Sequence, residues 1–260
     1  MNRISETFQK LQQQKKPAIV PYVTPEFPLK GTTVPLLLAL ERAGAAMIEI
    51  GIPFSDPLAD GPTIQHSSEI ALRNGATVLR VLELVKEARA QTAIPIILMG
   101  YFNPILYFGV EKFLTEAHHS GVDGLIIPDL PPEESKEFRE LSKKYGVSNV
   151  FLIAPTSSEE RIRVIDALST DFTYCVSVTG VTGSRSSFGN HFDEFLHRVK
   201  RNTKKPFVVG FGIKGKEQVT MISSIADGVV VGSALLQAME NATSVDEAVS
   251  LGKNFLSSLQ

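Results

Sequence analysis

The sequence of 260 residues is poor in several residue types on which common functions depend. It has one cysteine, Cys175, and no tryptophan. A single cysteine excludes a disulfide framework within the chain. Because Cys175 lies in the apolar run of residues 174–176, we interpret it as a buried structural thiol. The five histidines lack the spacing of metal ligands, so no metal site is expected.

Excess charge of one sign and long apolar runs are also missing. Lys and Arg number 26 against 28 Asp and Glu, and the net charge of -2 gives no general attraction to nucleic acid or anionic lipid. The longest apolar stretches, such as residues 34–40 and 228–236, are too short to span a bilayer. The N-terminal segment lacks the apolar core of a signal peptide. We therefore expect a cytoplasmic protein that acts on a small molecule or binds another protein.

Short apolar and β-branched runs alternate with segments of helical periodicity along the whole chain. The eight runs span residues 18–23, 46–52, 94–99, 124–127, 150–154, 172–178, 207–211 and 228–231. Strands that are apolar almost throughout are typical of a covered parallel sheet. The pattern predicts an α/β protein with one domain over residues 1–260, a (β/α)8 TIM barrel, and an open doubly wound sheet is the alternative. Residues 1–16 predict an extra amphipathic helix at the N-terminus.

Two carboxylates near the second run are candidates for catalysis. Glu49 lies in an otherwise apolar run, where an ionised side chain is costly unless it is paired or functional; a structural ion pair is the alternative. Asp60 follows in a loop, residues 53–62, with three prolines and two acids, and an ordinary turn aspartate is its alternative. Two carboxyl groups in different environments can divide acid and base duties, which suits carbon–carbon cleavage by proton transfer.

Glycine-containing turns follow the last three runs, at residues 180–185, 210–215 and 232–234. Glycines let backbone N–H groups approach an anion, and phosphate sites after strands seven and eight are common in TIM barrels. Residues 210–215 also match the dinucleotide motif G-x-G-x-x-G. However, the motif lies late in the chain, and the next strand ends in Gly232 and Ser233 rather than in an acid. We interpret the three turns together as a phosphate-monoester site, with ordinary loop geometry as the alternative.

The segment of residues 48–62, IEIGIPFSDPLADGP, closely resembles the tryptophan synthase alpha family. Shorter motifs fit the same family in the same order: YFNP at 101–104, PDLP at 128–131, GVTG at 180–183, GFGI at 210–213 and GS at 232–233. The likeness covers essentially the whole chain. It implies a lyase of L-tryptophan biosynthesis that cleaves indole-3-glycerol phosphate to indole and glyceraldehyde 3-phosphate by a retro-aldol step.

The resemblance also implies roles for individual residues. Glu49 would transfer protons at indole C3 and at the glycerol hydroxyl, and Asp60 would accept a hydrogen bond from the indole N–H. Thr182 would hold Asp60 in its working position. The phosphate would be bound by Gly183, Gly212, Gly232 and Ser233, and the indole pocket would be walled by Tyr22, Leu98, Ile126, Tyr174 and Phe211.

Family members bind a beta subunit that carries pyridoxal phosphate, usually as an αββα assembly, and pass indole to it through a tunnel. The resemblance thus implies no cofactor in this chain and a beta-subunit contact surface at Pro53, Asp56, Asn103 and Asp129.

Two residues depart from the family pattern: Tyr22 stands where many members have Phe, and Val178 where many have Arg. Three other functions stay open at this point. The chain could be a silent activator of a beta partner, a stand-alone lyase that releases free indole, or another phosphate-binding barrel such as a sugar-phosphate isomerase.

Overall fold

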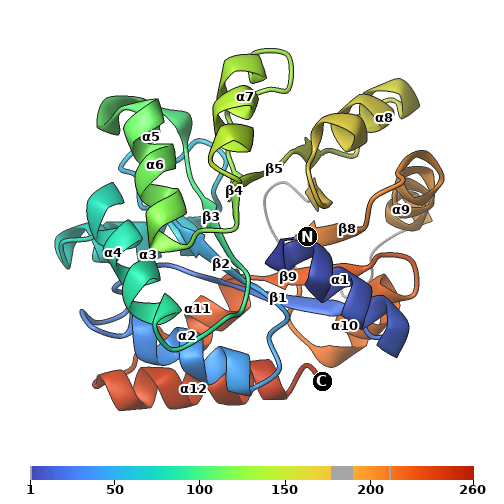
Figure 1. Ribbon diagram of the computed structural model, residues 1–260. Coiled ribbons are helices and arrows are strands. Elements are labelled where there is room, and N and C mark those ends of the chain that lie inside the picture. The colour runs from blue at the N-terminus through green and yellow to red at the C-terminus, as the bar shows by residue number, and fades with distance from the viewer. Residues whose placement is uncertain (1, 177–189, 211) are drawn as a thin grey trace.

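The computed structural model describes residues 2–176, 190–210 and 212–260, in which parallel strands form a barrel with helices around it (Figure 1). The strands are β1 (Ala18–Val23), β2 (Ile48–Gly51), β3 (Ile96–Met99), β4 (Gly124–Ile126), β5 (Ser148–Val150), β6 (Leu152–Ile153), β7 (Thr173–Val176), β8 (Phe207–Gly210) and β9 (Gly228–Val231). They are hydrogen-bonded in the order β5-β4-β3-β2-β1-β9-β8-β7-β6. The predicted TIM barrel is confirmed.

The fifth predicted strand is interrupted. We expected it at residues 150–154, but it consists of β5 and β6, which are separated by Phe151 alone. The Phe151 N–H donates to the Ser169 hydroxyl at 3.2 Å, while the Phe151 carbonyl accepts from the Tyr174 N–H. At Phe151 the Ser169 hydroxyl therefore takes the place of a backbone carbonyl as the acceptor, and the regular pairing of the strand is interrupted. Because β5 and β6 are consecutive in the chain, the two ends of the sheet belong to one interrupted strand.

The helices follow the strands on the outside of the barrel. They are α1 (Arg3–Gln14), α2 (Thr33–Arg42), α3 (Pro62–Arg73), α4 (Val78–Arg89), α5 (Phe102–Phe108), α6 (Val110–Ser120), α7 (Lys136–Lys144), α8 (Glu159–Leu168), α9 (Asn190–Asn202), α10 (Lys216–Ser223), α11 (Ser233–Met239) and α12 (Val245–Ser257). Within the described part of the chain, no helix is both long and apolar enough to cross a membrane.

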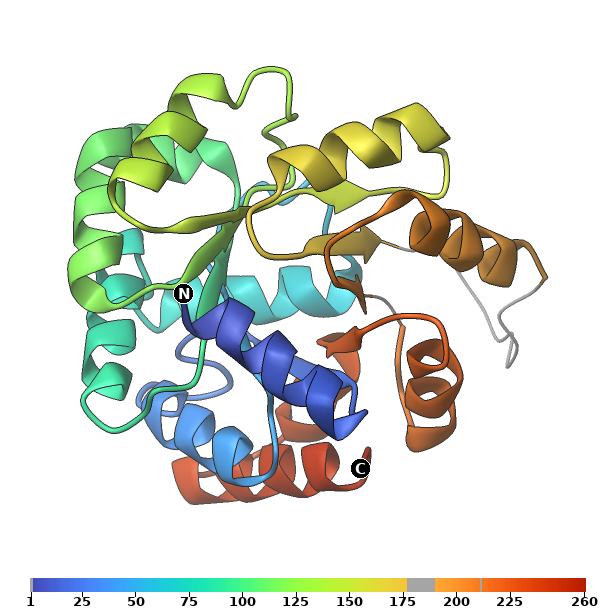
Figure 2. The ribbon, with the colours of Figure 1, turned by 45° about the vertical axis from the view of Figure 1, so that its right-hand side comes forward.

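Helix α1 is the predicted extra N-terminal helix, and it lies across one end of the barrel (Figure 2). Asn2 caps its start by accepting a hydrogen bond from the Ser5 N–H at 2.9 Å. The apolar side of the helix is buried, and the ring of Phe8 packs against Phe172 with 5.4 Å between centroids. Phe172 directly precedes β7, so α1 covers the end at which the strands begin. The other end is left for the loops that follow the strands.

The strand register decides which side chains face the barrel interior. Parallel pairing sets Tyr22 of β1 beside Glu49 of β2, so these two side chains share one face. Alternation along β2 then places Gly51 on the same face and Ile48 and Ile50 on the other. Both isoleucines are fully buried, as expected for the layer between sheet and helices.

Candidate active site

Glu49 is a buried acid with an unused oxygen. Its side chain is 1% exposed, and its Oε1 atom has no hydrogen-bond partner among the residues that the structure describes. Burial raises the pKa of Glu49 to about 8, and the nearby Asp60 carboxylate adds to the effect. Glu49 therefore carries a proton at neutral pH and can act as a general acid. The alternative of a structural ion pair has no support within the described ranges, where no salt bridge of Glu49 occurs.

Asp60 lies in the loop between β2 and α3, and it is half-buried. Burial raises its pKa, while a hydrogen bond from the Tyr101 hydroxyl opposes that rise. The loop is held on both sides of the carboxylate: the Ala59 N–H donates to the Tyr101 hydroxyl at 2.8 Å, and Gln65 Nε2 donates to the Asp60 carbonyl at 2.8 Å. The structure therefore brings the two candidate carboxylates into electrostatic contact in different environments, one almost fully buried and one at the rim.

Two buried tyrosines line the same space. Electrostatic effects of Glu49 and Asp60 raise the pKa of both Tyr22 and Tyr174, although burial is the larger cause for each hydroxyl. Each hydroxyl occupies room that a glycine leaves free. A methyl group on Gly51 would collide with the Tyr22 hydroxyl, and one on Gly210 would collide with the Tyr174 hydroxyl. These glycines serve close packing against an aromatic ring rather than an unusual turn.

The expectation for Leu98 is wrong. Register pairs Leu98 with Ile50, on the face of the sheet that points away from Glu49, and Leu98 is fully buried there. Met99 occupies the inner face instead, because Gly51 and Ile126 are its register partners. Ile126 thus lies on the expected face. Strand alternation identifies Met99 once the position of Glu49 is fixed, but the apolar run itself carries no mark of its inner side.

The predicted phosphate-binding residues fall partly within the described chain. Gly212 has φ +62°, the left-handed conformation that glycine adopts easily, and it is exposed. Gly232 precedes the first residue of α11, Ser233, and no side chain caps that helix. Thr182, Gly183, Phe211 and Val178 lie outside the described residues.

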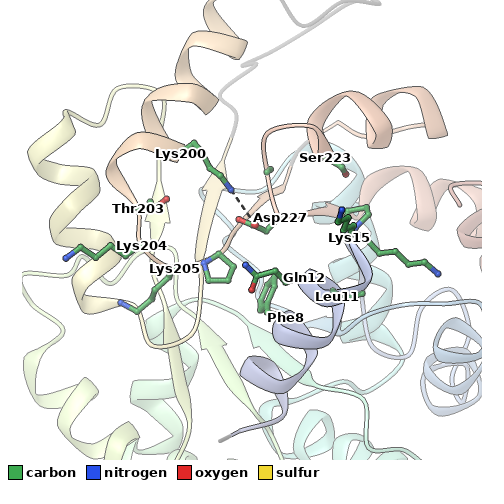
Figure 3. Close-up of a pocket in the computed structure, with 14 residues that line it drawn as sticks. Phe8, Leu11, Gln12, Lys15, Lys200, Thr203, Lys204, Lys205, Ser223 and Asp227 are labelled. Carbon is green, nitrogen blue, oxygen red and sulfur yellow. Dashed lines mark ion pairs between the residues drawn. The ribbon is translucent and has the colours of Figure 1, made fainter.

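A hollow of about 510 Å³ lies at the opposite end of the barrel from this site, beside α1 and the start of β8 (Figure 3). Five lysines and one acid, Asp227, line it. Figure 3 shows Lys200 directed at Asp227, with 3.5 Å between Nζ and the carboxylate, while Lys204 points outward. The lysines do not converge on one point, so this hollow is not the expected phosphate site. In the parts of the chain that are described, no group of three His, Cys, Asp or Glu side chains could hold a metal ion.

Known proteins with this architecture share both its sequence and its shape. The sequence model described as "Tryptophan synthase alpha chain" matches residues 8–257. The tryptophan synthase alpha chain of Chlorobium chlorochromatii is 47% identical, over 100% of this chain and 99% of its own length. The crystal structure of tryptophan synthase subunit alpha from Legionella pneumophila superposes with a TM-score of 0.91 at 36% identity, covering 100% of this chain and 97% of the other.

The chain belongs to the tryptophan synthase alpha chain family. The family predicted from residues 48–62 is thereby confirmed. A third similar structure, from Pyrococcus furiosus, has a TM-score of 0.84 at 41% identity, and it covers 93% of this chain and 97% of that one. Its title concerns mutual activation of the tryptophan synthase a2b2 complex.

The residues expected to contact a beta subunit of tryptophan synthase differ in their exposure to solvent. Asp56 and Asn103 are exposed. Asp129 is exposed too, and its Oδ1 accepts a hydrogen bond from the Phe102 N–H at 2.9 Å, so it fixes the first residue of α5. Pro53 is buried and offers little surface to a partner, which corrects its place in the expected interface.

One residue of this site was missed at the level of sequence. Tyr101 belongs to the YFNP motif that carries the family likeness, yet nothing in the motif indicates a role for its hydroxyl. The structure places that hydroxyl against Ala59 and Asp60, in a loop some 40 residues earlier. A contact of this separation depends on the parallel pairing of β2 with β3, which a local pattern does not encode.

Proposed function

We propose that this tryptophan synthase alpha chain cleaves indole-3-glycerol phosphate to indole and glyceraldehyde 3-phosphate with Glu49 and Asp60 as its two catalytic carboxylates. The observation that carries the proposal is the state of Glu49: it is buried, its Oε1 has no partner in the described part of the chain, its pKa is about 8, and it lies beside a second carboxylate. A buried polar atom without a partner is costly, so its retention fits a group that a substrate completes.

The proposed chemistry divides the work between the two acids. Protonated Glu49 gives its proton to indole C3, which leaves the ring positively charged. Asp60, ionised at the pocket rim, accepts a hydrogen bond from the indole N–H and stabilises that charge. Glu49, now a base, takes the proton of the glycerol hydroxyl next to the ring. The bond between C3 and the side chain breaks, its electron pair returns to the indole ring, and the aldehyde of glyceraldehyde 3-phosphate forms.

The remaining site residues have binding roles in this proposal. Tyr22, Ile126, Tyr174 and the newly placed Met99 wall the indole ring, together with Phe211. Gly183, Gly212, Gly232 and Ser233 bind the phosphate through their backbone, and Thr182 contacts Asp60. The exposed Gly212 with its positive φ and the uncapped start of α11 support the part of the phosphate site that is described.

We also propose that the chain works with a beta subunit in an αββα assembly in the cytoplasm. The similar Pyrococcus furiosus protein is named as part of such an assembly. The exposed Asp56, Asn103 and Asp129 form the proposed contact surface. Pyridoxal phosphate belongs to the beta subunit, and this chain needs no cofactor for the cleavage step.

Steady-state cleavage of indole-3-glycerol phosphate, measured with and without a beta subunit, tests the function. Activity that rises on addition of the partner supports the synthase subunit. Strong activity that does not respond to the partner favours a stand-alone lyase. Absence of cleavage in both conditions, with normal activation of the beta reaction, would identify a silent activator and overturn the proposed lyase.

An Asp60→Asn variant tests the role of the second carboxylate. It keeps the size of the side chain but loses the negative charge, so we expect turnover to fall by at least about 10²-fold with an unchanged fold. Circular dichroism and thermal unfolding check the fold. Near-normal turnover would remove Asp60 from the mechanism.

A further inference from the structure

Tyr101 follows β3 and has its hydroxyl in contact with the loop that carries Asp60. The side chain is 6% exposed, and its ring packs against Phe54 with 5.6 Å between centroids. Its hydroxyl accepts a hydrogen bond from the Ala59 N–H at 2.8 Å and donates one to the Asp60 carboxylate. One oxygen atom therefore binds the backbone and the side chain of two successive residues.

The backbone that carries Tyr101 is itself fixed by the barrel. The Gly100 N–H donates to the Ile126 carbonyl at 3.1 Å, and the Phe102 N–H donates to Asp129 Oδ1 at 2.9 Å. Tyr101 is thus anchored between two residues whose N–H groups bind β4 and the loop after it. The loop that it contacts is far less supported, since Leu58, two residues before Asp60, is 95% exposed. Tyr101 is therefore the fixed partner in this contact, and the loop that carries Asp60 is the one that it positions.

We propose that Tyr101 is the positioning residue for Asp60, and that its hydroxyl holds the carboxylate towards Glu49 before any substrate binds. This inference rests on the proposed function and adds a residue to it. Without the hydroxyl, the Ala59 N–H and the Asp60 carboxylate both lose a partner, and the contacts of Gln65 that remain reach only backbone carbonyls of the loop. Small displacements of a reacting group are enough to cost one to two orders of magnitude in rate.

The hydroxyl also affects the protonation of Asp60. Burial raises the pKa of Asp60, and the hydrogen bond from Tyr101 lowers it, because that bond favours the ionised form. Among the described residues, the titratable groups that interact with Asp60 or Tyr101 from the surrounding elements are Tyr22 on β1, Glu49 on β2, Asp129 after β4 and Tyr174 on β7. All are acids or phenols, and none supplies positive charge. Loss of the hydroxyl therefore raises the pKa of Asp60 further.

A Tyr101→Phe variant of the full chain tests the proposal, with Tyr145→Phe as its matched control. Tyr145 also donates to a carboxylate, Glu111 Oε1 at 3.0 Å, but on the surface at the end of α7. For Tyr101→Phe we expect kcat to fall about 10- to 100-fold, and the acidic limb of the kcat/KM profile to move to higher pH. For Tyr145→Phe we expect both to stay unchanged. A Tyr101→Phe variant with kcat within twofold of the original and an unmoved acidic limb would overturn the proposal.

A second measurement does not depend on activity. Amide hydrogen exchange at Ala59 and an NMR titration of the Asp60 carboxyl report the two hydrogen bonds directly. We expect faster exchange and a higher pKa in Tyr101→Phe, and no change in Tyr145→Phe. If both observables match the original protein, the positioning role is wrong even where the enzyme is active. If they change as expected in a chain that does not cleave the substrate, the proposed function fails and the contact stands.

Discussion

Two buried carboxylates, Asp123 at one end of the barrel and Glu49 at the other, have opposite surroundings. Asp123, directly before β4, is 6% exposed and fully partnered: Arg3 Nη1 lies at 2.8 Å, Arg89 Nη2 at 2.9 Å, and the Ile96 N–H donates to it at 2.8 Å. Glu49, on β2, is 1% exposed and has an oxygen with no partner in the described ranges. Both oxygens of Asp123 are therefore hydrogen-bonded, whereas one oxygen of Glu49 has no partner in the described ranges.

The difference follows from what each end does. The end that Asp123 occupies is covered by α1, which supplies Arg3 to the network, so a charge there can be satisfied within the chain. The end where the loops follow the strands has to admit a ligand, and a carboxylate there keeps binding capacity for it. In TIM barrels, chemistry belongs to the ends of the strands and stability to their beginnings. Asp123 and Glu49 illustrate this division, although not every acid follows it, since the buried Glu26 after β1 is paired with Arg80.

The largest effect on stability is expected from removing the Asp123 carboxylate. Asp123→Ala removes the partner of Arg89, whose side chain is only 14% exposed, and leaves that charge buried. We expect a loss of about 3–5 kcal/mol in the free energy of unfolding, measured by urea denaturation. Asp246→Ala, an exposed aspartate in the first turn of α12, is the control and should cost less than about 1 kcal/mol. Equal losses in the two variants would remove the contrast between the ends.

A substitution of Glu49 is expected to change the free energy of unfolding in the opposite direction to Asp123→Ala. Glu49→Gln removes the proposed proton-transfer group, so we expect turnover to fall by at least about 10²-fold. Its stability should rise. The pKa of about 8 in the folded chain lies above the usual value of 4.5, so ionisation favours the unfolded state, and stability falls as the pH rises from about 4.5 to about 8 and levels off above that. At pH 8.5 we expect the variant to gain on the order of 3 kcal/mol, and near pH 4 to gain nothing.

Urea denaturation of both proteins at pH 4 and pH 8.5 measures this gain, and a steady-state assay measures turnover. A variant that keeps its activity and is no more stable than the original protein at pH 8.5 would show that Glu49 is not catalytic and does not destabilise the fold. The contrast with Asp123 would then rest on geometry alone.

The sequence predicts the barrel well because eight apolar runs repeat along the chain, and it predicts Glu49 because one acid interrupts such a run. It does not predict the break at Phe151, which depends on a hydroxyl 18 residues away. It misassigns Leu98, since strands buried on both faces carry no alternation from which the inner side can be read. It cannot indicate that Pro53 is buried, because a proline in a loop has the same local pattern on either side of the surface.

The dependence of activity on pH is a smaller effect, and it tests whether Glu49 is protonated when the substrate reacts. Glu49 is active in its protonated form in the proposed first step, and its pKa is about 8. We therefore expect kcat/KM to fall above about pH 8, by about tenfold for each further pH unit. Initial rates between pH 6 and pH 10 measure this limb, and thermal unfolding at the same pH values controls for denaturation. A profile that rises through pH 9 would require ionised Glu49 in the first step.

The smallest effect is expected from the second arginine at the paired end. Arg3 and Arg89 both reach Asp123, but the Arg3 side chain is 44% exposed, whereas the Arg89 side chain also donates to the carbonyls of Gly121 and Ile94. Solvent screens the Arg3 pair, so Arg3→Ala should cost no more than about 1 kcal/mol, whereas Arg89→Ala should cost about 3 kcal/mol or more. Urea denaturation of both variants and of the double variant separates the two contributions. If Arg3→Ala were the more damaging change, α1 would stabilise the barrel mainly through this ion pair rather than through the packing of Phe8.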